Sequence, residues 1–300
     1  MSEIVGDWPR KTRELHNHHM DSTVWNDFAF RDDDIVISTY AKAGTTWTQQ
    51  IIAQLIFQGD ESIPVNQISP WWDMRVIPPQ VREAVEAQTH RRMLKTHLPV
   101  DALTMSPRAK YLYVARDGRD VVWSLYNHHS NFKPETYDLF NGTPGLVGEP
   151  LPRPDPDIHS YFQTWLKRDG FPFWSFWENI SSWWAARHAP NVKLVHFNNL
   201  KADLAGEMAA IADFLEIEVA PSLWPTLVEH CTFDHMKAHS ERYAPMGGHP
   251  WEGGGDTFIN KGTNGRWRDV LTPADSLAYE QMALEKLGAE GAHWLKTGER

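Results

Sequence analysis

The chain has 300 residues, which is enough for one large domain with a buried core, and its 41% hydrophobic and 23% charged residues are typical of a globular protein rather than a disordered one. Its 29 Lys and Arg against 39 Asp and Glu give a net charge of −10, which argues against general binding of nucleic acids or anionic membranes but is compatible with a local basic site for a small anion. A single cysteine, Cys231, excludes an intrachain disulfide and a cysteine–metal cluster.

The amino-terminal segment, residues 1–19, has no apolar core and therefore does not look like a secretory signal. No later run reaches the roughly 18 apolar residues that are needed to span a bilayer. We therefore expect a cytoplasmic protein with no membrane partner.

Four short apolar runs are expected to form strands, at residues 34–40, 92–97, 110–116 and 192–197. Helical patterns accompany them, and each has an apolar stripe or an N-terminal cap. The relevant residues are Ile51, Ile52, Leu55 and Ile56 after the first strand, Asp120 as a cap after the third, and Leu204, Met208, Ile211 and Leu215 after the fourth. A last helix is expected from about Pro273 to Gly288.

This alternation of strands and helices predicts an α/β fold of three layers, with a central, mostly parallel sheet and helices on both faces. We expect a single domain over residues 1–300. Two stretches rich in Gly and Pro, residues 141–157 and 238–257, are expected to be irregular. They are either lids over a binding site or plain surface insertions.

Three basic residues lie at, or just past, the ends of predicted strands: Lys42, His97 and Arg116. In a parallel sheet, ligands bind beyond the carboxyl ends of the strands. The sequence therefore predicts that these side chains meet at one rim, although they are far apart in the chain.

The segment YAKAGTTW, residues 40–47, joins the first predicted strand to a helix. Unpaired N–H groups at a helix N-terminus, a close-approaching Gly44, the charge of Lys42, and the hydroxyls of Thr45 and Thr46 would together suit a phosphate. The alternative is an ordinary strand–helix turn with a surface lysine. Lys42 precedes Gly44, whereas the lysine of the nucleotide-hydrolase loop follows its glycine, so the order differs from the ATPase pattern.

Four motifs in the order of this chain resemble those of the cytosolic, PAPS-dependent sulfotransferase family, and the chain looks like a bacterial-type member. Residues 40–47 resemble the 5′-phosphosulfate loop, usually written Y-P-K-[SA]-G-T-T-W, and KTHLP at 95–99 resembles the catalytic segment. VARDGRDVVWS at 114–124 resembles the 3′-phosphate segment, in which an Arg and a Ser stand eight apart. FINKGTNGRW at 258–267 resembles the C-terminal R-K-G-x-x-G-x-W loop.

The resemblance implies a P-loop-like fold and transfer of a sulfuryl group from 3′-phosphoadenosine 5′-phosphosulfate (PAPS) to a hydroxyl of a small acceptor, with adenosine 3′,5′-bisphosphate (PAP) as product and no metal. It implies that His97 is the general base and that Lys42, Lys95 and Ser124 assist the transfer. It implies a nucleotide site formed by Lys42, Gly44, Thr45, Thr46, Trp47, Arg116, Ser124, Phe233, Phe258, Lys261 and Gly262. Independently, a neutral histidine accepts protons near cell pH, and sulfuryl transfer, like phosphoryl transfer, depends on alignment and charge stabilisation.

The sequence departs from the family pattern at several positions. Asn260 stands where the family usually has an Arg that binds the 3′-phosphate, which should weaken donor binding unless Arg266 compensates. The family dimer segment would fall at residues 268–277, where Pro273 and Leu277 break it. The oligomeric state is therefore left open.

An excess of aromatic residues outside these motifs is either core or the wall of an acceptor pocket, and the second possibility would favour an aromatic or apolar alcohol. The candidates are Trp71, Trp72, Phe173, Trp174 and Trp177. Histidines cluster at residues 16–19 and 128–129, but neither group has the spacing of a zinc site, and we expect them to be solvated.

Three rival functions remain open at this point: a kinase-like P-loop enzyme, a non-catalytic binder of adenosine bisphosphate, and a carbohydrate sulfotransferase. The position of Lys42 and the lack of a clear magnesium-binding Asp disfavour the first. A binder without activity has no chemical need for His97. Carbohydrate sulfotransferases are often membrane-anchored or secreted, and the lack of an apolar anchor or signal segment in this sequence disfavours the third. We expect no nucleic-acid partner.

Overall fold

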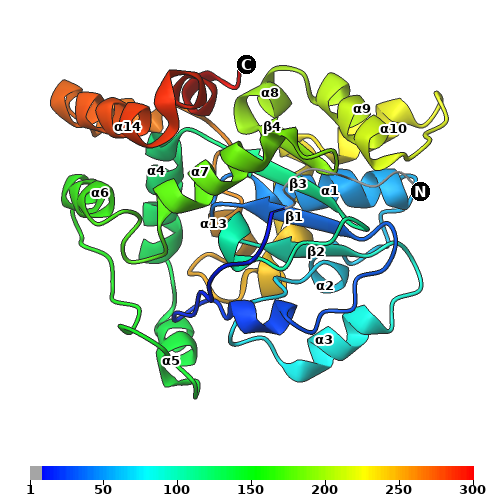
Figure 1. Cartoon of the computed structure of the whole chain (residues 1–300), viewed down its shortest axis with the longest axis horizontal. Coiled ribbons are helices and arrows are strands. Elements are labelled where there is room, and N and C mark those ends of the chain that lie inside the picture. The colour runs from blue at the N-terminus through cyan, green and yellow to red at the C-terminus, as the bar shows by residue number, and fades with distance from the viewer. Residues whose placement is uncertain (1–8) are drawn as a thin grey trace.

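A computed structural model of the chain describes residues 9–300; the earliest part of the amino-terminal segment considered above lies outside these residues. Four parallel strands form one sheet, in the order β2-β1-β3-β4 (Figure 1). They are β1 (Ile35–Thr39), β2 (Met93–Thr96), β3 (Lys110–Ala115) and β4 (Val192–His196). Each lies within one residue of its predicted bounds, and the register pairs Ile37 with Lys95 on one side and with Leu112 on the other.

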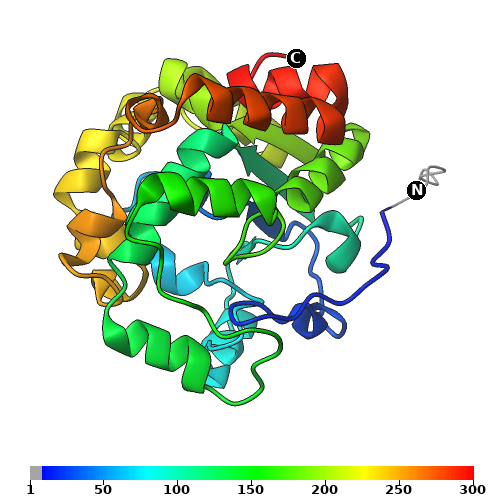
Figure 2. The ribbon, with the colours of Figure 1, turned by 90° about the vertical axis from the view of Figure 1, so that its left-hand side faces the viewer.

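Both faces of the sheet are covered, because successive side chains of a strand point to opposite sides. Ile35 and Ile37 pack with the apolar faces of α1 (Thr45–Ile56), α9 (Leu204–Leu215) and α10 (Trp224–His230). Val36 faces a second core, to which α4 (Gly118–Ser130), α6 (Ile158–Lys167), α7 (Phe176–Ala185) and α14 (Pro273–Thr297) contribute. The predicted three-layer α/β architecture is confirmed (Figures 1 and 2).

Shorter elements connect these layers. The remaining helices are α2 (Val65–Ile68), α3 (Pro79–Glu86), α5 (Pro134–Gly142), α8 (Phe197–Ala202), α11 (Phe233–Ala238), α12 (Ser240–Tyr243) and α13 (Gly254–Phe258). Single 3-10 turns occur at Ser22–Trp25, Val100–Ala102, Ala186–His188, Pro245–Gly248 and Arg266–Asp269. None of the helices within residues 9–300 has the length and apolarity to cross a membrane.

Three predictions about element bounds were wrong. Asp120 was expected to cap the helix after the third strand, but α4 begins earlier and its N-cap is Asp117, which accepts a hydrogen bond from the N–H of Arg119; Asp120 lies within the first turn. The last helix was expected to end at Gly288; Gly288 does leave helical geometry, with φ of 70°, but α14 continues to Thr297. The continuation is stabilised because Trp294 is buried and stacks on Trp184 at 4.9 Å between ring centroids. The stretch 238–257 is not irregular throughout, since it contains α12, a 3-10 turn and the start of α13. Residues 143–157 contain no helix or strand.

Candidate functional site

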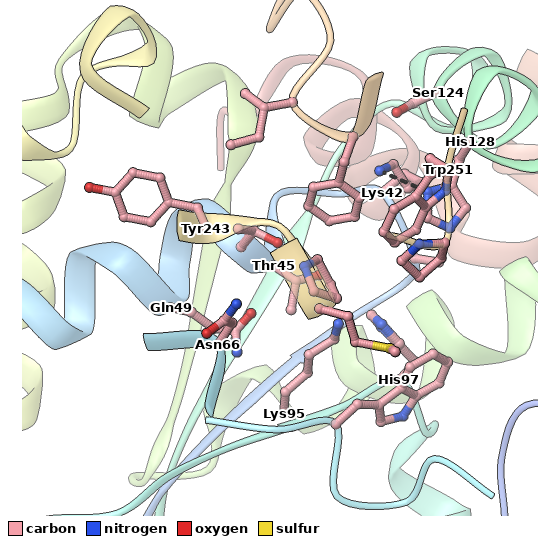
Figure 3. Close-up of a pocket in the computed structure, with 18 of the residues that line it drawn as sticks. Lys42, Thr45, Gln49, Asn66, Lys95, His97, Ser124, His128, Tyr243 and Trp251 are labelled. Atoms are coloured by element: carbon pink, nitrogen blue, oxygen red, sulfur yellow. Dashed lines mark hydrogen bonds between the residues drawn. The ribbon is translucent and has the colours of Figure 1, made fainter. Parts of the chain in front are cut away.

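A cavity of about 1130 Å³ opens at the carboxyl ends of the strands (Figure 3). Residues that follow each of the four strands line it, and parts of residues 66–84, 123–140 and 233–266 complete its walls. The nucleotide and catalytic candidates that line it are Lys42, Gly44, Thr45, Thr46, Trp47, Lys95, His97, Arg116, Ser124, Phe233, Phe258, Lys261 and Gly262. The fold therefore brings together side chains that are more than 200 positions apart in the sequence.

The aromatic candidates divide into two groups. Trp71, Phe173 and Trp174 line the cavity. Trp72 and Trp177 do not; both are about 3% exposed and belong to the larger core, where Trp72 packs on Phe28 and Trp177 on Tyr279. Sequence alone could not separate the groups, because all five rings lie next to other aromatic residues or turn signals.

The loop after β1 places backbone donors at the cavity. Gly44 is the N-cap of α1 with φ of 120°, and Lys42 also has a positive φ, of 68°. A Cβ atom at Gly44 would come within 3.1 Å of the Phe197 ring, so the loop needs glycine there. The first N–H groups of α1 have no partner within the helix and carry the positive end of its dipole. The loop is therefore suited to an anion.

Three cations surround the same space. Lys42, Lys95 and Arg116 make no ion pair with any carboxylate among residues 9–300. Burial, together with Lys95 and Arg116, lowers the pKa of Lys42 to about 7, and burial lowers the pKa of Lys95 to about 8. Asp73 attracts Lys95, and Asp120 and Asp117 attract Arg116, but without a direct ion pair. Lys42 has no such carboxylate and is repelled by the other two cations, which indicates a site that suits a ligand anion.

His97 has one defined tautomer. Its Nδ1 lies 2.7 Å from the carbonyl oxygen of Thr39, so Nδ1 carries the proton and donates it. Nε2 therefore has a free lone pair and no hydrogen-bond partner within residues 9–300. Burial, with a smaller contribution from Lys95 and Lys42, keeps the pKa of His97 well below its usual value. A neutral imidazole with an available Nε2 at a cavity wall can accept a proton.

Asp73 supports this wall, and sequence reasoning missed it. Its buried carboxylate accepts hydrogen bonds from the Trp25 indole at 2.7 Å, from the Trp71 indole and from the Thr96 hydroxyl. Burial raises the pKa of Asp73 to about 6. The bond to Trp71 fixes an indole that meets the His97 ring edge-on, with 4.5 Å between ring centroids. No signal in the sequence distinguished Asp73 from a surface carboxylate.

Lys42 has a neighbour that sequence reasoning did not assign. Its Nζ donates to Nδ1 of His128 at 3.3 Å (Figure 3). The same Nζ lies 4.3 Å from the centroid of the Phe258 ring. His128 stands one helical turn after Ser124 on α4, so both residues face the cavity. Burial and the charge of Lys42 keep the pKa of His128 well below its usual value, so His128 is a neutral acceptor.

The C-terminal loop closes one end of the cavity over Arg116. The guanidinium donates to the Thr263 carbonyl at 3.0 Å and to the Asn264 side chain at 2.9 Å, and it stacks on Phe197 at 4.2 Å. Gly262 packs against the Phe233 ring so closely that a Cβ atom would lie 2.4 Å from it. This end of the cavity is therefore built by packing as well as by charge.

Asn260 and Arg266 both line the cavity. Arg266 lies over the Trp123 ring, 3.6 Å from its centroid, and forms no ion pair within the described part of the chain. Trp123 directly precedes Ser124 on α4. A guanidinium without an ionic partner is thus available next to Ser124.

The histidines predicted to be solvated are mostly buried, so that prediction was wrong. His18, His19 and His129 are 5%, 3% and 0% exposed. His129 is satisfied by the Pro152 carbonyl and Tyr161, while His19 stacks on Phe140 and lines the cavity. Histidine occurs both in protein interiors and at surfaces, and no periodic apolar pattern around these residues indicated that they are buried. Among residues 9–300, no grouping of His, Cys, Asp and Glu could hold a metal ion.

Comparison with known proteins gives consistent results. The family model described as "Sulfotransferase domain" matches residues 32–291. A glycolipid sulfotransferase of Mycobacterium tuberculosis is 28% identical over 302 residues, covering 93% of each chain. Human sulfotransferase 2B1 is 30% identical over 259 residues, covering 84% of this chain and 65% of that protein. The crystal structure of mouse sulfotransferase SULT7A1 complexed with PAP matches with a TM-score of 0.69 at 20% identity over 91% of both chains, a likeness of fold.

Proposed function

The chain belongs to the sulfotransferase family and is a sulfotransferase enzyme, and from this premise we propose that it transfers a sulfuryl group from PAPS to a hydroxyl of a small aromatic or otherwise apolar acceptor. The observation that carries the proposal is the juxtaposition, around one cavity, of one neutral imidazole and three cations that form no direct ion pair within residues 9–300. These are Lys42, Lys95, Arg116 and His97. A nucleotide kinase is disfavoured because Lys42 precedes Gly44, whereas the lysine of the nucleotide-hydrolase loop follows its glycine.

The residues present fit a donor that carries two anionic groups. The first turn of α1 and Lys42 would hold the 5′ side, where backbone N–H groups and an uncompensated ammonium meet. Arg116 and Ser124 would hold the 3′-phosphate, with Lys261 and Gly262 over it and Arg266 in place of the cation lost at Asn260. When bound, PAPS supplies the sulfuryl group and remains as PAP.

Aromatic side chains next to the loop would hold the base of the nucleotide. The Trp47 indole donates to the Cys231 carbonyl at 2.7 Å, which fixes the ring, and it packs edge-on against Phe197. Phe233 is held by its contact with Gly262. Trp47 and Phe233 both line the cavity, and flat apolar rings suit an adenine by stacking. Phe258 instead packs against the Lys42 ammonium.

His97 would take the proton from the acceptor hydroxyl at Nε2. Its Nδ1–H remains on the Thr39 carbonyl throughout, so the ring does not turn when Nε2 gains charge. Lys42 and Lys95 would stabilise the negative charge on the leaving and transferred groups. Since transfer of this kind depends on alignment, the main work of the cavity is to hold the hydroxyl in line with the donor.

The acceptor end of the cavity is aromatic, which favours a flat apolar acceptor. Trp71 and Trp174 flank the His97 ring at 4.5 and 5.5 Å between centroids, and Phe173 packs edge-on against Trp174. Tyr40 donates to the Trp174 carbonyl at 2.8 Å and fixes that segment. A phenol placed between such rings would present its hydroxyl to His97.

The first test is a calorimetric titration of the protein with adenosine 3′,5′-bisphosphate, with AMP and ATP as controls. We expect a strong preference for the bisphosphate. Equal binding of AMP would contradict the 3′-phosphate site formed by Arg116 and Ser124. A panel of phenols and aliphatic alcohols with PAPS then tests the acceptor class, and turnover of sugars alone would contradict the aromatic acceptor.

A further inference from the structure

A second imidazole lines the acceptor end of the cavity and takes no part in the chemistry proposed above. His19 is 3% exposed and lies among aromatic rings, 4.0 Å from Phe140 and 5.3 Å from Phe173 between centroids. Burial keeps its pKa well below the usual value, so the ring is neutral. A neutral buried imidazole has one N–H donor and one acceptor nitrogen, and each needs a partner.

The hydrogen bonds around His18 decide which nitrogen of His19 carries its proton. Nε2 of His18 lies 2.8 Å from the Pro172 carbonyl, which can only accept, so this Nε2 donates. Burial lowers the pKa of His18, and the neutral ring therefore has a lone pair on Nδ1. That Nδ1 is hydrogen-bonded to Nδ1 of His19, which must donate. The remaining atom, Nε2 of His19, is an acceptor with a lone pair.

This lone pair has no hydrogen-bond partner within residues 9–300, although His19 lines the cavity. The His19 ring lies 5.9 Å from the Trp71 ring and 6.0 Å from the Trp174 ring. These are the same two indoles that flank His97. The acceptor end of the cavity thus has apolar aromatic walls and two fixed nitrogen acceptors, one of which the transfer reaction leaves unused.

We propose that Nε2 of His19 accepts a hydrogen bond from a second hydroxyl or N–H group of the acceptor, so that the preferred substrates are flat, apolar molecules with two donor groups rather than simple phenols. This inference rests on the proposed function and specifies its substrate class. A second group that only accepts hydrogen bonds, such as an ether oxygen, would gain nothing, because the Pro172–His18–His19 chain leaves no proton on Nε2. Recognition would therefore depend on a donor in the ligand.

The test uses rigid acceptors of nearly equal size: 2-naphthol, the dihydroxynaphthalene isomers that contain its hydroxyl, and their methyl ethers at the second hydroxyl. Affinity is measured by calorimetry in the presence of PAP, and kcat/KM with PAPS. We expect at least one dihydroxy isomer to bind about 3- to 10-fold more tightly than 2-naphthol, which is the range of one neutral hydrogen bond. We expect its methyl ether to lose that gain.

The variant His19→Phe keeps an aromatic ring but removes the lone pair, and it should bring the dihydroxy isomer down to the level of 2-naphthol. His19→Gln places a carbonyl oxygen near the position of Nε2 and should retain part of the preference. Unchanged binding of PAP shows that each variant is folded. A preference that survives in His19→Phe, or the absence of any preference in the wild-type protein, would overturn the inference. Failure of the proposed function is a separate result, because it would appear as loss of selective PAP binding or turnover in the wild-type protein.

Discussion

The substitution His97→Gln tests the general base most directly. Gln has a side chain of similar length, but its amide is not a base at neutral pH. Since Nδ1 of His97 is held by the Thr39 carbonyl and Nε2 has no other partner in the described chain, the substitution removes one proton acceptor and little else. A positioned base contributes about 10²- to 10⁴-fold to a rate, or roughly 3–5 kcal/mol of barrier. We expect kcat to fall by about that factor, with little change in the affinity for PAP.

The pKa of His97 adds a second readout with a definite sign. Burial, Lys95 and Lys42 all favour the neutral ring, so the folded-state pKa lies below the ordinary value of 6.5. The active, unprotonated form is therefore fully present above pH 6.5 and is lost only as the pH falls through the lowered pKa. The wild-type rate should show this loss on the acid side, and the residual rate of His97→Gln should not.

The assay combines sulfated-product formation at saturating PAPS with calorimetric titration of PAP. His293→Gln is the matched control, because His293 is largely exposed and lies outside the cavity. Retention of kcat within about threefold in His97→Gln would refute the assignment, since even a weak general base contributes more. Loss of PAP binding together with activity would instead assign His97 a structural role between Trp71 and Trp174.

Three further predictions concern the residues at the nucleotide-binding end of the cavity. Because the pKa of Lys42 is about 7 in the ligand-free protein and a bound anion restores its charge, PAP binding at pH 8 should take up protons, up to about one at this group, and fewer below pH 7. Calorimetric titration in buffers of different ionisation enthalpy measures this uptake, and zero uptake at pH 8 would contradict the prediction. Arg266→Ala should weaken PAP binding about tenfold or more without changing AMP binding, and adding Asn260→Arg to this variant should restore the affinity for PAP. An equal loss of AMP affinity in the calorimetric titration would argue against a contact of Arg266 with the 3′-phosphate. In Gly262→Ala the new Cβ atom would lie 2.4 Å from the Phe233 ring, so the ring should be displaced and the binding of both PAP and AMP should weaken. Unchanged affinity in the same titration would contradict this packing.

The strands and the donor loop could be predicted because their determinants are local. The run at residues 111–115 is apolar throughout, which a strand buried on both faces requires, and Gly44 marks the turn between β1 and α1. The positions of Lys42, His97 and Arg116 at the ends of predicted parallel strands then predicted that they meet at one rim. By contrast, the end of α14 depends on contacts between Trp294 and Trp184, which are 110 positions apart and invisible to any local pattern.

The supporting side chains of the site could not be predicted for a different reason. Asp73, His19 and His128 have ordinary surroundings in the sequence, and their roles depend on groups far away in the chain. Asp73 accepts hydrogen bonds from Trp25 and Thr96, and His128 contacts Lys42. The proton of His19 is set by its neighbour His18, which in turn is bonded to the distant Pro172 carbonyl. Likewise, Trp71 and Trp72 are neighbours, yet one lines the cavity and the other lies in the core. Alternation along an irregular segment has no fixed period, so sequence offers no rule for which ring faces inward.

The way the chain closes around Arg116 has a consequence for biosynthesis. The guanidinium is positioned by Thr263 and Asn264, and Gly118, at the start of the helix that carries Ser124, donates its N–H to the Tyr279 hydroxyl at 2.8 Å. During translation these partners leave the ribosome long after the loop at residues 40–47. A nascent chain that lacks these residues would therefore have an incomplete site for the proposed nucleotide. If the proposed nucleotide binds, it would stabilise only the nearly complete polypeptide, and it would protect the finished enzyme from degradation without assisting its synthesis.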